Sequence, residues 1–185
     1  MKPSTSAILV PANDSAAWLA LVEEAFAAHG FERSDAPLPT GYRPRRDERL
    51  ELGLGWGQWE GSGLLIPSDV DAVFRIALWL SESAGSTPLV ALRRYMGLPP
   101  VIKLYIDGKP RWKDGVDDDL EVSFPVVTHR PLDLQGPEES GLPASAVAME
   151  RALSSLLDDK QARRSPRSRL EWRAYLSRKS RLAQG

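Results

Sequence analysis

The sequence contains no cysteine and only two histidines among its 185 residues. Without cysteine there is no disulfide framework, no thiolate metal site and no cysteine nucleophile. The two histidines, His29 and His129, belong to none of the spaced motifs that mark zinc enzymes or serine hydrolases. The lack of cysteine also fits a reducing compartment, so we expect a cytoplasmic protein.

Long hydrophobic runs are also missing. No stretch approaches the roughly 18 apolar residues that a membrane span requires. Near the N-terminus, Lys2 precedes the apolar run Ala7–Val10, but Pro11 follows at once, which makes the run too short for a signal peptide. We therefore expect a soluble chain without a membrane span.

Neither a phosphate loop nor a calcium loop is recognisable. Five glycines lie between positions 53 and 63, but a nucleotide-binding loop requires G-x-G-x-x-G directly before a helix. Gln58 and Glu60 occupy the position of the third glycine in the two registers. The acidic run Asp114–Asp119 lacks the spacing of an EF-hand and is better explained as a solvated turn. We expect no cofactor and no metal ion.

The stretch of residues 64–80 organises the rest of the chain, because it joins a short apolar strand to a strongly apolar helix. Ser68 is expected to cap this helix, and Asp69 and Asp71 place negative charge in its first turn. Apolar residues recur at three- and four-residue steps and extend beyond one stripe, which is typical of a helix packed on more than one face. The pattern predicts a central core helix over residues 68–82.

The remaining patterns predict an α+β fold. Strands and helices follow one another without regular β–α alternation, which favours a mixed, largely antiparallel sheet packed on the core helix and on an N-terminal helix. Period-two alternation and turn residues mark the strands. Besides the core helix, the expected elements are strands over 7–10, 49–56, 58–66, 88–94, 101–106, 109–113 and 120–127, and a helix over 15–29. Asn13 or Asp14 is expected to cap this helix, and Asp107-Gly108 is expected to form the tight turn before the strand over 109–113.

Composition divides the chain into three segments. Residues 1–127 form the α+β core domain, and residues 128–142 form a linker rich in proline and glycine. Residues 143–185 are expected to form a C-terminal helical arm that is basic from residue 160. Within this arm, apolar spacing predicts a helix over 143–163, and a capping box that begins at Ser168 predicts a final helix to about residue 182.

The net charge of −1 hides a strong asymmetry. Residues 160–185 carry nine lysines and arginines against one acid, a charge of +8, whereas the other 159 residues carry 15 basic and 24 acidic side chains, a charge of −9. Clustered cations beside aromatic rings suit nucleic-acid phosphates and stacked bases. The same segment would also suit docking on the acidic body, an acidic protein partner or an anionic membrane. The candidate nucleic-acid-binding residues are Arg163, Arg164, Arg167, Arg169, Trp172, Arg173, Tyr175, Arg178, Lys179 and Arg181.

A second basic group lies in a proline-rich loop over residues 35–46, and two tryptophans flank the bend after the strand over 49–56. Tryptophan, tyrosine and arginine are favoured at protein interfaces. We therefore expect a non-enzymatic soluble binding protein that engages a macromolecular partner, in an immunity-type or adaptor role. The alternative is a nucleic-acid-associated protein that binds RNA or DNA through the basic tail. The third hypothesis is an enzyme that uses a polar pocket which no local sequence motif indicates. The candidate partner-binding residues are Trp56, Trp59, Tyr42, Arg43, Arg45 and Arg46.

Overall fold

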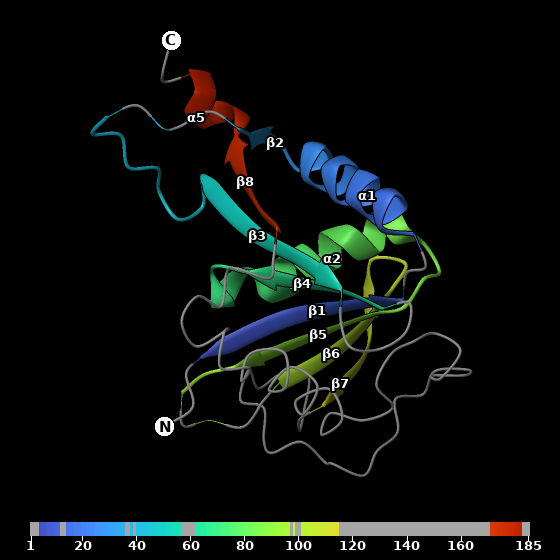
Figure 1. Ribbon diagram of the computed structural model, residues 1–185. Helices are drawn as coiled ribbons and strands as arrows, with labels where there is room; N and C mark the ends of the chain where they lie inside the picture. The colour runs from blue at the N-terminus through green and yellow to red at the C-terminus, as the bar shows by residue number, and fades with distance from the viewer. Residues whose placement is uncertain are drawn as a thin grey trace.

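In the computed structural model, the described residues form one eight-stranded antiparallel sheet together with helices (Figure 1). The α+β class and the antiparallel character of the sheet are thereby confirmed. The expected strand over 120–127, the linker over 128–142 and the helix over 143–163 lie outside the described residues. The described residues are 4–11, 14–35, 38, 40–56, 62–96, 98, 101–114 and 171–182.

The elements follow one another in an irregular order along the chain. The longest described helix has 14 residues, and none of the described helices is long and apolar enough to cross a membrane. In chain order the elements are β1 (Thr5–Pro11), α1 (Ser15–Ala28), β2 (Phe31–Ser34), β3 (Arg49–Trp56), β4 (Ser62–Pro67), the 3₁₀ helix η1 (Val70–Ala72), α2 (Val73–Ala84), β5 (Leu89–Arg94), β6 (Val101–Ile106), β7 (Lys109–Asp114), β8 (Glu171–Ser177) and α5 (Arg178–Leu182).

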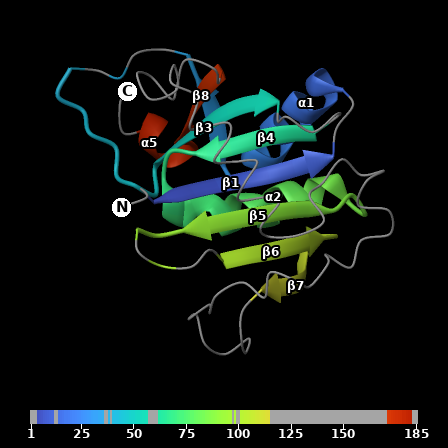
Figure 2. The same ribbon diagram turned by 60° about the horizontal axis from the view of Figure 1, so that its bottom comes forward.

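The strands lie in the order β2-β8-β3-β4-β1-β5-β6-β7. Figure 2 displays this order from β8 to β7. The first strand, β1, lies inside the sheet because it pairs with β4 on one side and with β5 on the other. Strands β5, β6 and β7 form a meander. Its last turn has φ of +53° at Asp107 and +66° at Gly108, the mirror-image geometry that an Asp-Gly pair favours in tight hairpins. The turn expected at these two residues is confirmed.

The start of α1 agrees with the sequence, but the start of the core helix does not. The Asp14 carboxylate accepts hydrogen bonds from the backbone N–H groups of Ala16 and Ala17, which caps α1. Ser68 does not cap the core helix: no side chain caps α2, and the backbone N–H of Ser68 donates to the Glu51 carbonyl on β3. Asp69 instead caps a short 3₁₀ turn, and regular α-helix begins only at Val73.

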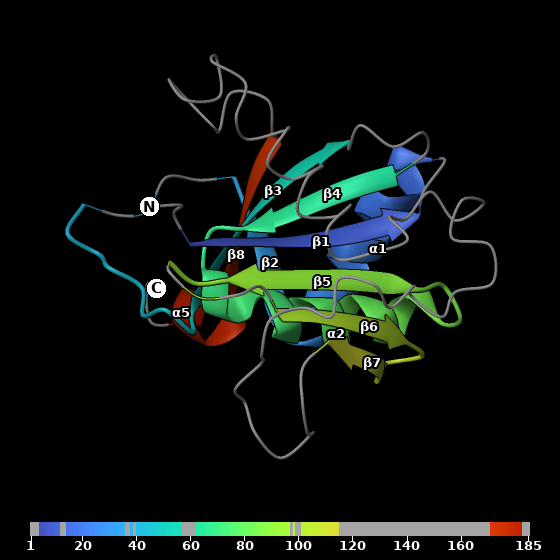
Figure 3. The same ribbon diagram turned by 90° about the horizontal axis from the view of Figure 1, so that it is seen from below.

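An aromatic cluster joins three elements that are far apart in the sequence. The ring of Phe26 on α1 lies 4.3 Å from that of Tyr175 on β8 and 6.0 Å from that of Trp79 on α2, measured between centroids. Helix α2 also packs on β1, β5 and β6. Figure 3 shows both helices behind the strands, so α1 and α2 share one face of the sheet. The main core lies between this face and the two helices.

The opposite face of the sheet is apolar as well. Leu9 on β1 and Val90 and Leu92 on β5 are at most 1% exposed, yet they do not belong to the core cluster beneath α1 and α2. Side chains alternate between the two faces of a strand, so these residues point away from the two helices. Burial on both faces explains why β1 and β5 read as continuous apolar runs rather than as an alternating pattern.

The expected C-terminal helical arm, residues 143–185, is wrong over residues 171–177. This segment is β8, which lies between β2 and β3 and pairs antiparallel with both. Aromatic residues suit strands as well as helices, and β8 satisfies the backbone hydrogen-bonding groups that β2 and β3 would otherwise expose. Only Arg178–Leu182 is helical.

Two buried tyrosines make the fold sensitive to alkaline pH. Burial raises the pKa of Tyr105 to about 12. Burial and the adjacent Glu23 carboxylate also raise the pKa of Tyr175. A folded-state pKa above the unfolded value of about 10 means that stability is complete below that pH and falls as the pH rises toward the folded-state pKa. We expect the urea midpoint to fall between about pH 10 and 12, and to fall less in Tyr105→Phe; an equal decrease in both proteins would contradict this assignment.

Candidate functional site

The loop between β2 and β3 forms a shallow basic hollow of about 520 Å³ against the junction of β4 and η1. Four arginines and two acids line this hollow, so the lining carries a net charge of +2. The lining contains four of the six residues expected from the sequence to contact a partner: Tyr42, Arg43, Arg45 and Arg46. We refer to this feature as the basic hollow.

Arg46 fastens the loop to the body of the protein. Its guanidinium group donates hydrogen bonds to the carboxylates of Asp69 and Asp71, at the start of η1. Tyr95 on the loop after β5 also donates to Asp71, and these interactions hold the pKa of the Asp71 carboxyl below its usual value. Arg46 is therefore an anchor of the loop, and its charge is already matched by two carboxylates.

A second set of hydrogen bonds shapes the loop from within. The Glu48 carboxylate accepts one hydrogen bond from the backbone N–H of Arg45, at 3.0 Å, and one from the Tyr42 hydroxyl, at 3.4 Å. Its backbone carbonyl accepts the N–H of Ser177 at the end of β8. These hydrogen bonds hold residues 42–48 of the loop in one conformation, which lowers the entropy that this segment loses on binding.

Among the described residues, Arg43 and Arg45 are the two cations of the hollow that pair with no carboxylate and so remain available to bind a partner. Both side chains are exposed, and within the described residues neither forms an ion pair. By contrast, Arg49 on β3 pairs with Glu51. The arrangement therefore presents two uncompensated guanidinium groups beside the Tyr42 ring on a preformed loop.

The two tryptophans expected to bind a partner are not gathered into the basic hollow. Trp56 is the last residue of β3, where its backbone pairs with Gly63, and its side chain is outside the described atoms. Arg49, which lines the hollow, is the first residue of the same strand. Seven residues of strand span roughly 23 Å, so the backbone at Trp56 lies far from the hollow. Trp59 lies outside the described residues.

The residues expected to bind nucleic acid do not form a free basic surface where the structure describes them. Tyr175 is completely buried and its hydroxyl donates to Glu23 at 3.0 Å, so it is not available for base stacking. The Arg173 side chain is 11% exposed and pairs with both Glu23 and Glu171. Trp172 is half-buried within β8, Arg178 pairs with Glu32, and Lys179 is exposed. Arg163, Arg164, Arg167 and Arg169, and the side chain of Arg181, lie outside the described part of the chain.

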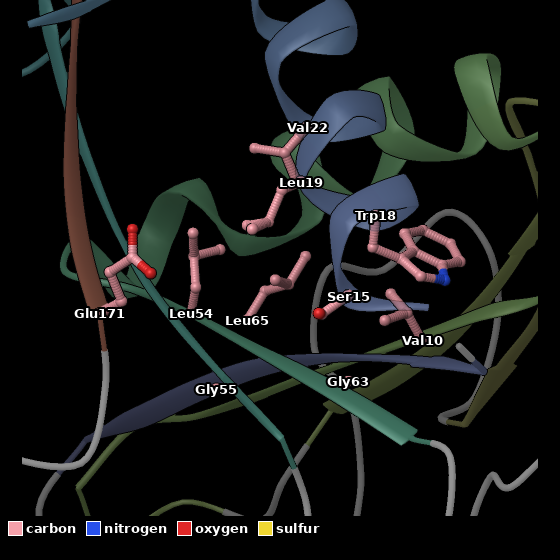
Figure 4. Close-up of a pocket in the computed structure, with 10 residues that line it drawn as sticks. All are labelled: Val10, Ser15, Trp18, Leu19, Val22, Leu54, Gly55, Gly63, Leu65 and Glu171. Carbon is pink, nitrogen blue, oxygen red and sulfur yellow. The ribbon is translucent and has the colours of Figure 1, made fainter. Parts of the chain in front are cut away.

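A second cavity, of about 330 Å³, lies between the N-terminal half of α1 and strands β1, β3, β4 and β8 (Figure 4). Apolar side chains from α1 and from the sheet face one another across it, and Glu171 lies at the end formed by β8. We refer to it as the apolar cavity. The sequence did not reveal it, because helical periodicity alone does not show how far a helix lies from a sheet.

The only histidine in the described ranges has a structural position. His29 follows the last residue of α1, where its Nε2 atom lies 2.8 Å from a carboxylate oxygen of Glu82 on α2. Its ring stacks on Trp79 at a centroid distance of 4.3 Å. These contacts hold the C-terminal ends of the two helices together. Across the described ranges, no group of three or more His, Cys, Asp and Glu side chains is arranged to hold a metal ion.

Comparisons of this chain with protein-family models, with curated proteins and with solved structures each gave no match. Function is therefore inferred from the residues of the two cavities. The basic hollow contains the arginines that the sequence singled out, whereas the apolar cavity emerges only from the fold.

Proposed function

We propose that this is a non-enzymatic binding protein that engages an acidic protein partner through the basic hollow. The observation that carries the proposal is the pair of exposed, uncompensated guanidinium groups of Arg43 and Arg45 beside Tyr42. Arginine and tyrosine are the residue types that dominate binding energy at protein interfaces. Arg46 supports the site indirectly, because its contacts with Asp69 and Asp71 fix the loop.

The charges within the hollow favour a protein partner over a nucleic acid. Glu51 and Asp69 lie among the arginines, so a continuous phosphate backbone would meet carboxylates as well as cations. Nucleic-acid affinity depends on neutralising successive phosphates with clustered cations. A protein surface with a few discrete carboxylates matches the mixed pattern better, because such surfaces place opposite charges against each other residue by residue.

An immunity-type or adaptor role is part of the proposal, since both roles act by binding and not by catalysis. A cytoplasmic location also belongs to the proposal, because a chain without cysteine has no need of an oxidising compartment. The nucleic-acid alternative depends mainly on the basic residues outside the described part of the chain.

The test reverses the two available charges. We expect Arg43→Glu/Arg45→Glu to weaken binding of an acidic protein partner by at least about tenfold, because two attractive contacts become repulsive. The matched control is Arg33→Glu/Lys109→Glu, which reverses two exposed charges on β2 and β7, outside the hollow and outside the basic tail, and should retain binding. Quantitative affinity capture, followed by calorimetry with the purified partner, measures the effect.

The same variants distinguish binding of an acidic protein from binding of nucleic acid. Single- and double-stranded oligonucleotides serve as probes in fluorescence anisotropy at two salt concentrations. Strong, salt-sensitive binding of oligonucleotides that both double variants retain would contradict the proposal and favour a nucleic-acid surface elsewhere. Equal capture of an acidic partner by the two double variants would exclude the basic hollow as its binding site.

A further inference from the structure

The apolar cavity exists because the first half of α1 stands away from the sheet. Helix α1 packs mainly on α2 and β2, and its buried residues, Val22, Ala25 and Phe26, lie in its C-terminal half. Its earlier residues Trp18 and Leu19 are only half-buried. Figure 4 shows Leu19 facing Leu54 and Leu65 of the sheet across the cavity, and Trp18 beside Val10. The cavity is thus bounded by partly exposed side chains of α1 on one side and by the sheet on the other.

A glycine enlarges the cavity from the side of the sheet. Gly63 on β4 is two residues before Leu65 and therefore points to the same face of the sheet. Its neighbours across the ladder are Val10 on β1 and Trp56 on β3. Because Gly63 has no side chain, the floor of the cavity is open at this point. Gly63 does not have a positive φ, so the strand does not require glycine there for conformational reasons.

One end of the cavity carries an excess of negative charge. The Arg173 guanidinium lies 2.9 Å from a carboxylate oxygen of Glu171 and 3.1 Å from one of Glu23 on α1. Two carboxylates share this one cation, which leaves a net charge of −1. The Glu171 side chain is 59% exposed and lines the cavity, so its remaining acceptor positions are open to a ligand.

From this arrangement we infer that the apolar cavity binds a small apolar molecule that carries a protonated amine. The apolar body lies between α1 and the sheet, and the ammonium group donates to the Glu171 carboxylate. A volume of about 330 Å³ lies within the range of small-molecule sites, which are mainly apolar with a few polar groups that orient the ligand. The inference is independent of the proposed partner binding, because it uses none of the residues of the basic hollow.

Three eight-carbon probes with different head groups test the inference: octylamine, octanol and octanoate, each below its aggregation concentration. At about pH 7 the amine is protonated and the acid is ionised. Isothermal titration calorimetry should give the highest affinity for octylamine, a lower affinity for octanol and the lowest for octanoate. Equal affinities for octylamine and octanol, or no binding of any probe, would overturn the inference.

Two kinds of variant separate the contribution of the Glu171 charge to ligand binding from that of the cavity volume. Glu171→Gln should lower the affinity for octylamine by about three- to tenfold and leave that for octanol unchanged, as expected for a partly exposed charge pair. Asp35→Asn, which removes a 78% exposed carboxylate elsewhere, is the matched control and should bind octylamine like the wild type. If Glu171→Gln kept its preference for octylamine, the assigned role of Glu171 would be wrong.

Filling the cavity should abolish binding of all three probes. Gly63→Leu places a side chain on its floor, and Leu19→Trp fills it from the helix if the strand variant does not fold. Circular dichroism confirms that the chosen variant is folded before titration. Undiminished binding of octylamine by a folded, filled variant would show that the probe binds outside the apolar cavity and would overturn the inference.

Discussion

Replacing Tyr175 by alanine is expected to lower the free energy of unfolding by about 3–5 kcal/mol, as for other fully buried aromatic side chains. Tyr175 lies in the middle of β8, is completely buried and contacts Phe26 of α1. Its loss would leave a void where β8, α1 and the neighbouring strands meet. It would also remove the hydroxyl that donates to Glu23. Urea denaturation followed by circular dichroism measures the change in midpoint.

Tyr175→Phe is the matched control for this experiment. It keeps the ring and removes only the hydrogen bond to Glu23, so the expected loss is about 0.5–1.5 kcal/mol. If residues 171–182 formed an exposed helix instead of a strand, the alanine variant would lose little stability. A decrease below about 1 kcal/mol in Tyr175→Ala would therefore contradict the position of β8 in the sheet.

Gly108→Ala is expected to lower the free energy of unfolding by about 2–4 kcal/mol, from backbone strain and a steric clash together. Gly108 has a φ of +66°, which a residue with a Cβ atom adopts only at a cost. A Cβ atom there would lie 2.6 Å from the Cγ atom of Glu82 on α2. The turn has little freedom to retreat, because the Gly108 N–H donates to the Ser81 hydroxyl at 3.0 Å.

A double-mutant cycle separates the two contributions. In a Glu82→Ala background the side chain that causes the clash is absent, so Gly108→Ala should then cost only about 1–2 kcal/mol from backbone strain. Thermal unfolding of the four proteins gives the coupling. Equal costs of Gly108→Ala in both backgrounds would show that Glu82 does not restrict the turn.

Local signals identified the elements whose partners are close in the sequence. Period-two alternation predicted β3, and the Asp107-Gly108 pair predicted the turn between β6 and β7. Asp14 was one of two candidates for the cap of α1, and the structure selects it. In each of these cases the determining contacts span only a few residues, and such contacts leave a clear pattern in the sequence.

Two neighbouring strands near one edge of the sheet, β8 and β2, were not predictable in the same way. The steps between Trp172, Tyr175 and Leu176 suit a helix, and only the edges of β2 and β3 make the segment a strand. The short edge strand β2 had no recognisable signal of its own. Tertiary contacts override local propensity in such segments.

The candidate site shows the same limit. The arginines of the basic hollow were identified from composition, but their different roles were not. Arg46 is an anchor because Asp69 and Asp71, more than twenty positions away, accept its hydrogen bonds. Arg43 and Arg45 have no such partner among the described residues. The sequence shows where charged residues cluster, whereas the contacts made in the fold determine which of these charges remain unpaired and can bind a ligand.

The position of β8 also has a consequence for biosynthesis. Ser34 at the end of β2 pairs with Ala174, which is 140 positions later in the chain. Ribosomes add about 5–20 residues per second, so roughly 7–30 s separate the appearance of β2 from that of its neighbour. During this interval β2 and the outer edge of β3 expose unpaired backbone groups, which can pair with other nascent chains. Chaperone capture of the emerging polypeptide would protect these edges until β8 arrives.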